Sequence, residues 1–393
     1  MADNTDDVQP PAADETIASA VHGYWDPGPG PRLRVDDPGE LIAALPAFIE
    51  FVPERSLVVV VLRRPAAPGS SSTIGPVLRF DLDQDGGKQG SAAAIASAVA
   101  GICAAEESTE VLAVIIDDRL REPRRRRTPA AATGSGALLA AFARHMAHEQ
   151  VRLTGAWAVA AIQARQRWWS LLDANQQGTL PDPATSMIAF AYVLNGRPIR
   201  ASRSQLSDLV VQDQDSAQEV AAHLEQAVSR ERGRYVAAIR GADLPRYRRR
   251  GLEQVLCRIA DLDSGLLPTA RQKAQLGALL RERLVREALL ALAVGEYAAA
   301  AEQLWVTLVQ SLPGTDRAHA AVLLAYSAYV RGDGPLAGIA LNAALDADPS
   351  HSMAILLDTA LRSGMRPEEL RRLAHHARRI TDDLGIDLGP IQH

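Results

Sequence analysis

At 393 residues the chain is too long for one ordinary hydrophobic core, so its length favours two domains. Hydrophobic residues make up 47% and charged residues 23%, a balance typical of a folded globular protein. The formal net charge of -5 provides no overall positive field to attract nucleic acid, and two cysteines are too few for a disulfide framework or a cysteine-based zinc site.

Both cysteines, Cys103 and Cys257, lie in apolar helical patterns, and we expect two buried thiols in a reducing compartment. The first residues are acidic and rich in proline, and they lack the basic start and apolar run of a signal peptide. No apolar run approaches the roughly 20 residues that span a bilayer. The sequence therefore predicts a cytoplasmic protein with no membrane partner.

The chain begins with an acidic segment rich in proline and glycine, which predicts a disordered tail at 1–31. A short strand is expected at 33–35. Asp36 or Asp37 then offers an N-cap, and Pro38 suits the first position of a helix.

The apolar residues that follow Pro38 lie at helical spacing on one face, and Pro53 ends this predicted helix. Residues 57–62 are a continuous run of leucine and valine, which suits a strand covered on both faces. We expect this strand to be the central strand of the first domain.

Strand and helix patterns then alternate. The predicted strands are 77–82, 111–116, 153–162 and 167–172, the last two paired with each other, and the predicted helices are 91–105, 137–150 and 184–194. This alternation predicts an α/β domain over residues 32–215, a mixed sheet with packed helices.

From residue 216 onward every predicted element is a helix, and Gly or Pro stands at nearly every junction. The predicted helices are 216–240, 251–262, 268–294, 297–311, 317–330, 335–347, 352–363 and 367–384. Residues 216–386 are thus expected to form an all-α domain.

Part of this helical domain resembles a tetratricopeptide unit, between Ala318 and His351. Small residues stand where two helices must approach closely (Ala325, Ala337 and Ala344), and the spacing fits the 34-residue unit. We expect tetratricopeptide-like helical hairpins. Because only one unit fits well, an ordinary helical bundle is the alternative.

Five segments match a known family in order, over about residues 33–367. They are ELIAALPAFIEFVPERSLVVVVL, VLRFDL, RQRWWSLL, NGRPIRASRSQL and LLAYSAYVRGDGPLAGIALNAALDADPSHSMAILL. The chain resembles an actinobacterial family catalogued only as domain of unknown function 4192. The resemblance implies no established activity, cofactor or catalytic residue. Relatives often carry cysteines after the WWSL segment, where this chain has LDANQQGTLPDP, so a metal or thiol role there is not essential here.

The candidate catalytic residues are carboxylates at predicted strand ends. Asp117 and Asp118 directly follow a buried strand, and ligands of open α/β sheets bind outside the carboxyl ends of strands. Two adjacent carboxylates there could hold Mg²⁺ or transfer protons. Asp81 could join them only if its strand is a neighbour. The alternative is an ordinary solvated strand end.

Other cofactor and metal motifs are absent or incomplete. Asp81, Asp83, Asp85 and Gly86 match the start of a calcium loop, but its twelfth position is Ala92 and a strand precedes it, so we expect an acidic turn. There is no phosphate-binding loop, dinucleotide motif or nucleophile elbow. The sequence therefore predicts no cofactor and assigns no metal ligand.

Two arginine clusters stand out, at 121–127 with Arg124–Arg127 at its centre, and at 246–250. The first could meet phosphate, nucleic acid or an acidic protein, and the alternative is a solvated or disordered loop. No aromatic residues interleave the first cluster, and the second could pair with carboxylates of its own domain. Nucleic acid is therefore disfavoured as a partner.

The leading function predicted from the sequence is a non-catalytic binding or scaffolding protein that meets a protein partner through its helical hairpins. That function requires an exposed apolar groove within residues 284–384. Two alternatives stay open: an enzyme with a metal-assisted acidic site at the strand ends, and a nucleic-acid-binding protein that uses the arginine clusters. A homo-oligomer is also open.

Overall fold

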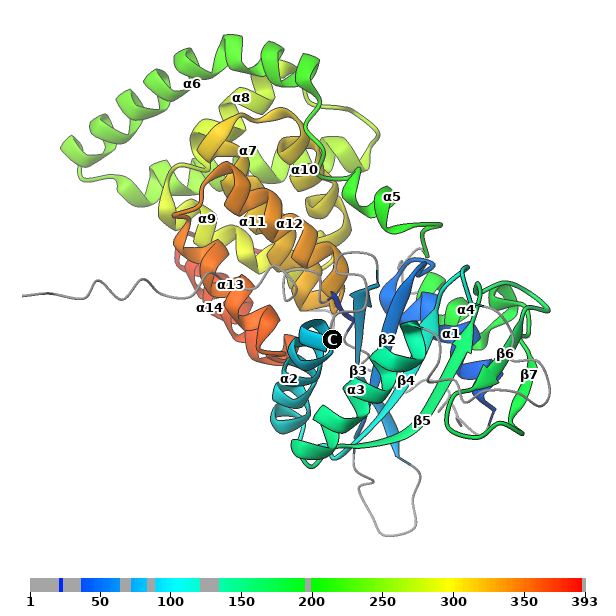
Figure 1. Cartoon of the computed structure of the whole chain (residues 1–393). Helices are drawn as coiled ribbons and strands as arrows, with labels where there is room; N and C mark the ends of the chain where they lie inside the picture. The colour runs from blue at the N-terminus through cyan, green and yellow to red at the C-terminus, as the bar shows by residue number, and fades with distance from the viewer. Residues whose placement is uncertain are drawn as a thin grey trace, which may run out of the picture.

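A computed structural model describes residues 21–23, 37–63, 72–82, 89–120, 134–194 and 199–390, and it combines one sheet with a region made of helices (Figure 1). Several predictions lie outside these residues: the strand at 33–35, most of the predicted tail, the calcium-like turn after Asp81, and the arginine cluster at 121–127.

Seven strands form one mixed sheet in the order β1-β3-β2-β4-β5-β6-β7. They are β1 (Val21–Gly23), β2 (Ser56–Arg63), β3 (Thr73–Asp81), β4 (Glu110–Ile116), β5 (Arg152–Val159), β6 (Arg167–Ser170) and β7 (Gln177–Thr179). The β4–β5 pair is parallel and the other pairs are antiparallel. The predicted mixed sheet with packed helices is confirmed.

Strands β2, β4, β5 and β6 lie close to their predicted positions, and β6 pairs with β5 as expected. Strand β3 begins earlier than predicted, at Thr73. The three-residue strands β1 and β7 are too short to show an alternating pattern. Strand β1 lies within the segment predicted as a tail and pairs with β3. The predicted central position of β2 is also wrong, because β4 is the middle strand and β2 lies beside it.

Both faces of β2 are covered, which accounts for its continuous apolar run. Leu57, Val59 and Val61 pack in one core with α2 (Gln89–Ala105) and α3 (Gly134–His148), which lie side by side on one face of the sheet (Figure 1). Val58 and Val60 belong to the core of the other face, which also contains residues of α1 (Pro38–Ile49) and α4 (Met187–Leu194).

The start of α1 follows the predicted capping pattern. Asp37 is the N-cap, its carboxylate accepts a hydrogen bond from the Gly39 amide at 2.8 Å, and Pro38 opens the helix. The helix ends earlier than predicted, at Glu50, which adopts a left-handed conformation with φ 61°. Buried α1 residues such as Leu41 and Leu45 belong to the core on the face of the sheet that contains Val58 and Val60.

In the described part of the chain, the elements that follow α4 are all helices. They are α5 (Arg203–Ser207), α6 (Gln214–Arg240), α7 (Leu244–Asp263), α8 (Ala270–Leu279), α9 (Arg283–Leu289), η4 (Leu290–Val294), α10 (Ala298–Ser311), α11 (Gly314–Arg331), α12 (Gly334–Ala347), α13 (Ser352–Arg362) and α14 (Pro367–Asp383), and a short 3-10 helix, η3 (Pro183–Thr185), precedes α4. Below, residues 37–207 are called the sheet region and α6 to α14 the helical region. No helix in the described ranges is both long enough and apolar enough to cross a membrane.

The predicted helix at 268–294 is broken into α8, α9 and η4. The break occurs at Glu282, whose carboxylate accepts a hydrogen bond from the Val285 amide at 2.7 Å and so caps a new helix. The break turns α9 toward α11 and so shapes one wall of the cleft described below.

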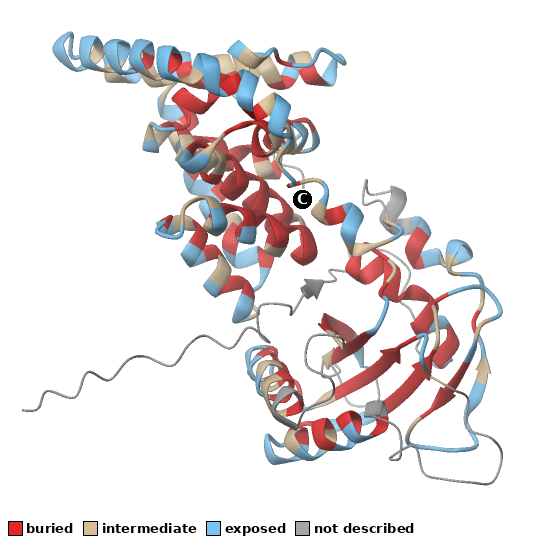
Figure 2. Ribbon diagram, turned by 45° about the horizontal axis from the view of Figure 1, so that its top comes forward, coloured by how far each residue is buried: buried red, intermediate tan, exposed pale blue. Residues whose placement is uncertain are grey.

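Helices α11 and α12 form a tight hairpin at the centre of the helical region, where buried residues are concentrated (Figure 2). Gly332 ends α11 in a left-handed conformation with φ 86°, which favours glycine. The small residues Ala325, Ala337 and Ala344 are fully buried. This pair is therefore a helical hairpin with small, buried residues at its crossing.

Helix α14 closes the region instead of extending an open array. The hydroxyl groups of Tyr326 and Tyr329 on α11 donate hydrogen bonds to the main-chain oxygens of Leu370 (2.8 Å) and Met365 (2.9 Å). Helix α14 also packs against η4 and α9. An open solenoid would leave the inner face of α11 free. The arrangement therefore favours the helical-bundle alternative.

Contacts between the two regions are specific. Glu106, at the end of α2, has a fully buried carboxylate that pairs with Arg63 (2.9 Å) and, across the junction, with Arg366 (3.0 Å). The core on the α1 side of the sheet is continuous with that of the helical region. A division at residue 215 thus remains a prediction based on the change of element type.

Candidate functional site

The predicted acidic site lies at one end of the sheet. Asp81 of β3 and Ile116 of β4 both lie opposite Ser56, because both strands pair antiparallel with β2. Asp81 and Asp117 therefore lie at the same end of the sheet, but strand β2 lies between their strands. At the usual spacing between strands this separates them by roughly 10 Å. The condition that their strands be neighbours is not met.

Each candidate carboxylate is paired with arginine. The ion pairs are Asp81 with Arg79 and Arg203, Asp117 with Arg119, and Asp118 with Arg55. In the described ranges no group of three or more His, Cys, Asp and Glu could hold a metal ion. Because guanidinium groups occupy the places a cation would take, the geometry favours a charge-paired strand end.

We expect Asp117→Asn to destabilise the protein by about 1–3 kcal/mol, because Asp117 is buried and accepts hydrogen bonds from the Arg119 amide and guanidinium. Urea unfolding measures this change. The matched control is Asp118→Asn, at the exposed neighbouring position, which should unfold like the wild type. If Mg²⁺ raised the melting temperature of the wild type and not of the Asp117→Asn variant, the metal-assisted site would be supported instead.

A second group of charges lies where the helical region meets the sheet region. Arg331 Nη2 lies 3.0 Å from Glu302 and 3.1 Å from Asp333, whose side chain is fully buried. Burial raises the pKa of Glu302 above its usual value, while the guanidinium groups of Arg331 and Arg200 oppose that rise. Each charge here faces an opposite one, which indicates a structural anchor.

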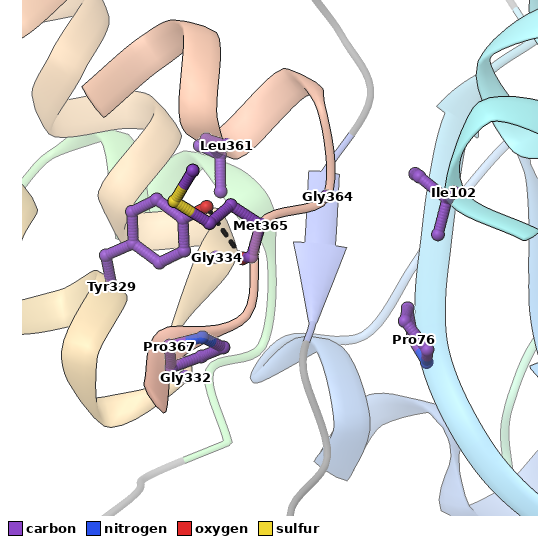
Figure 3. A pocket seen from close by; sticks show the side chains of 9 residues that line it. All are labelled: Pro76, Ile102, Tyr329, Gly332, Gly334, Leu361, Gly364, Met365 and Pro367. Atoms are coloured by element: carbon purple, nitrogen blue, oxygen red, sulfur yellow. Dashed lines mark hydrogen bonds between the residues drawn. The ribbon is translucent and has the colours of Figure 1, made fainter. Parts of the chain in front are cut away.

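A small apolar cavity lies at the junction of the two regions (Figure 3). Figure 3 shows Ile102 and Pro76 on one side and Leu361 and Met365 on the other. A Cβ atom at Gly364, whose φ is 70°, would lie 2.9 Å from Ile102, so the backbones approach closely here. The cavity holds only about 20 Å³, which leaves room for about one water molecule and for no substrate.

The best candidate binding site is a cleft of about 270 Å³ between α9, α11 and the start of α13. Five apolar side chains contribute to its lining, and the polar part includes Arg283, Arg286, Glu287 and His351. The apolar residues are Leu290, Val322, Leu323, Met353 and Leu356. Leu356 is 66% exposed and its neighbour Ile355 is 45% exposed, so the apolar surface continues outside the cleft. The cleft lies on the segment where a groove is expected.

Two histidines from successive hairpins meet beside this cleft. His351 caps α13, because its Nδ1 accepts a hydrogen bond from the Ala354 amide at 3.3 Å. Its Nε2 lies 3.0 Å from Nδ1 of His319. The cap requires a proton-free Nδ1 on His351, so the Nε2–H of His351 donates to His319. Both rings are therefore neutral in this arrangement.

Burial, together with the positive charge of Arg286, lowers the pKa of both rings, and it lowers that of His319 to about 3. The negative charge of Asp348 opposes this lowering at both rings, and the positive charge of Arg281 adds to it at His319. Because the unfolded chain protonates these rings near pH 6.5, the stability they confer is complete above that pH and falls as the pH drops toward 3.

The free energy of unfolding of the wild type should therefore fall when the pH is lowered from 7.5 to 5. We expect this fall to be about 1–2 kcal/mol larger than in the double variant His319→Asn and His351→Asn. Asparagine keeps the capping ability at position 351. Urea unfolding at both pH values measures the difference. His148→Asn, at an exposed position, is the control, and equal pH dependence in all three proteins would contradict the expectation.

A second, polar cleft of about 360 Å³ lies between α7 and α8. Cys257 lines this polar cleft and is exposed, so the prediction that it is buried is wrong. The Sγ atom of Cys257 lies 3.2 Å from Arg258 Nη2. Cys103 is buried as predicted, and burial raises its pKa to about 12. A thiol with such a pKa is inert at neutral pH.

Comparison with known proteins gives one match. No curated protein matches the chain, and no solved structure does. One family model matches residues 38–368, from the start of α1 into α14. The resemblance seen in the five segments is thus confirmed. The chain belongs to the family described as Domain of unknown function (DUF4192).

Proposed function

We propose that this protein is a non-catalytic, cytoplasmic binding protein that takes a segment of a protein partner in the cleft between α9, α11 and α13. The observation that supports this proposal is the composition of the cleft, an apolar wall beside the guanidinium groups of Arg283 and Arg286. Pockets that combine a mainly apolar lining with a few polar groups are the usual sites for binding.

The chemistry of the lining specifies the partner segment. The volume of the cleft is large enough for a few side chains of a partner and too small for a folded domain. Leu290, Val322 and Leu323 suit an apolar anchor, and the nearby guanidinium groups suit a carboxylate next to that anchor. Arg283 also pairs with Glu287 at the rim, which keeps its guanidinium in place. The segment is therefore an acidic peptide with large apolar residues.

The strand-end carboxylates take no part in this proposal, because each is held by an arginine. Binding, unlike catalysis, needs no reactive group in the cleft, and the histidine pair beside it is neutral and linked by its own hydrogen bonds.

Selection of a random peptide library on the full chain tests this function. We expect the enriched peptides to carry large apolar residues flanked by Asp or Glu, and to be lost when the selection uses the variant Leu356→Asp. This change places a carboxylate on the apolar wall at an exposed position, so folding should be unaffected. Enrichment of basic peptides, or equal enrichment on both proteins, would contradict the proposal.

A further inference from the structure

The end of α6 and the start of α7 form a helical hairpin that projects beyond the neighbouring helices (Figures 1 and 2). This hairpin, residues 229–250, is called the arm. Helix α6 has four buried residues, and the last of them is Glu231; the next buried residue of the chain is Gly251. Most of the arm therefore has no part in the hydrophobic core.

The arm is strongly cationic. It carries eight arginines, no lysine and two carboxylates, a formal charge of +6 in a chain whose total is -5. All of its arginines except the half-buried Arg248 are exposed. Charge of this density on a surface that contributes little to the core favours a docking role.

Internal ion pairs neutralise only part of this charge. Four of the arginines face carboxylates: Arg234 faces Glu231, Arg246 faces Asp243, Arg248 faces Glu282 and Arg249 faces Glu253. Within the described ranges, Arg230, Arg232, Arg240 and Arg250 make no ion pair. Four guanidinium groups from two adjacent helices are thus available to an anion.

The arm is held in one shape. The rings of Tyr235 on α6 and Tyr247 on α7 pack edge to face with centroids 5.5 Å apart. The Arg248–Glu282 pair, at 3.1 Å, ties the base of the arm to the start of α9. A fixed scaffold reduces the entropy lost when the arginines bind a partner.

We propose that the arm is a docking surface for the phosphate backbone of double-stranded nucleic acid. The fork of a guanidinium group matches a phosphate with two hydrogen bonds, and the arm uses arginine alone. No exposed aromatic side chain of the arm offers a platform for base stacking, so a duplex fits better than a single strand.

The arm fits a duplex better than it fits a membrane. From Arg230 to Arg240 the helix advances ~15 Å, a distance over which a duplex presents several phosphates. Its exposed large apolar residues are Val236 and Ile239 alone, too few for the apolar face of a membrane-surface helix. Because the arm lies on α6 and α7, this inference is independent of the cleft.

The test measures binding of a fluorescent DNA duplex of about 24 base pairs, and of the same sequence as RNA duplex, by the full chain at salt concentrations from about 50 to 200 mM. We expect binding that weakens by roughly 100-fold over this range if four phosphates are contacted. The triple variant Arg230→Glu, Arg232→Glu and Arg240→Glu should lose at least ~10-fold in affinity at the lowest salt.

The control carries the same change of charge elsewhere, at the exposed Arg271, Arg372 and Arg379, and should bind like the wild type. Circular dichroism checks that both variants are folded. Equal loss in the two triple variants, absence of duplex binding, or binding of phosphatidylserine vesicles or polyaspartate in place of the duplex would each overturn the proposal.

Discussion

Replacing Asp333 with alanine is expected to lower the free energy of unfolding by about 3–5 kcal/mol. The Asp333 carboxylate is fully buried, pairs with Arg331 and caps α12 by accepting a hydrogen bond from the Leu336 amide at 2.9 Å. Removing it takes one carboxylate from the half-buried guanidinium group of Arg331 and removes the helix cap. Chemical denaturation measures the loss.

The control for this prediction is Asp213→Ala, which removes the N-cap of α6 at an exposed position without a buried ion pair. It should cost only about 1 kcal/mol, the typical contribution of a cap. If both variants lost the same stability, the ion pair with Arg331 would contribute nothing, and the anchoring role of this charge group would be wrong.

Replacing Glu106 with glutamine is expected to cost about 2–4 kcal/mol and to uncouple the two regions. The buried carboxylate joins Arg63 of the sheet region to Arg366 of the helical region, at 2.9 and 3.0 Å. A neutral amide forms no ion pair, and its single oxygen cannot replace both carboxylate oxygens. Scanning calorimetry should then show two transitions, whereas we expect one for the wild type.

The neighbouring residue provides the control for Glu106. Glu107 is exposed, and Glu107→Gln changes the net charge by the same amount without touching the junction. This variant should melt like the wild type. A single unchanged transition in Glu106→Gln would mean that the apolar contacts at Ile102 and Gly364 hold the regions together without the ion pairs.

Elements with local signals could be predicted from the sequence. The N-cap Asp37 with Pro38, and the valine run of β2, depend on neighbouring residues and appear as expected. β7 could not be predicted, because its residues Gln177–Thr179 carry no alternating pattern and become a strand only by pairing with β6. The same applies to β1, which needs the edge of β3.

The candidate sites depend on which helices pack together, and this limits prediction. His319 and His351 are far apart in sequence, and the only signal that could have related them is the hairpin period that places them on successive hairpins. The arginine cluster at 246–250 could be identified from the sequence. Only the fold shows that it lies beside the arginines at the end of α6, so that the two helices form one cationic surface.

The error at Cys257 has a simple geometric cause. The surrounding apolar residues Val255, Ile259 and Leu262 recur at helical spacing and are buried. Cys257 is two positions from Val255, which places it on the other side of the helix, toward the polar cleft. An apolar neighbourhood in sequence therefore does not determine the burial of each residue in it.

The central claim, that the cleft between α9, α11 and α13 binds a partner segment, is tested most directly by calorimetric titration of one selected peptide. The proteins are the wild type, Leu356→Asp in the cleft, and Leu267→Asp, a matched change at another exposed leucine outside the cleft. The proposal predicts that Leu267→Asp binds like the wild type and that Leu356→Asp binds at least ~10-fold more weakly, about 1.4 kcal/mol. Equal affinity for all three proteins would contradict it.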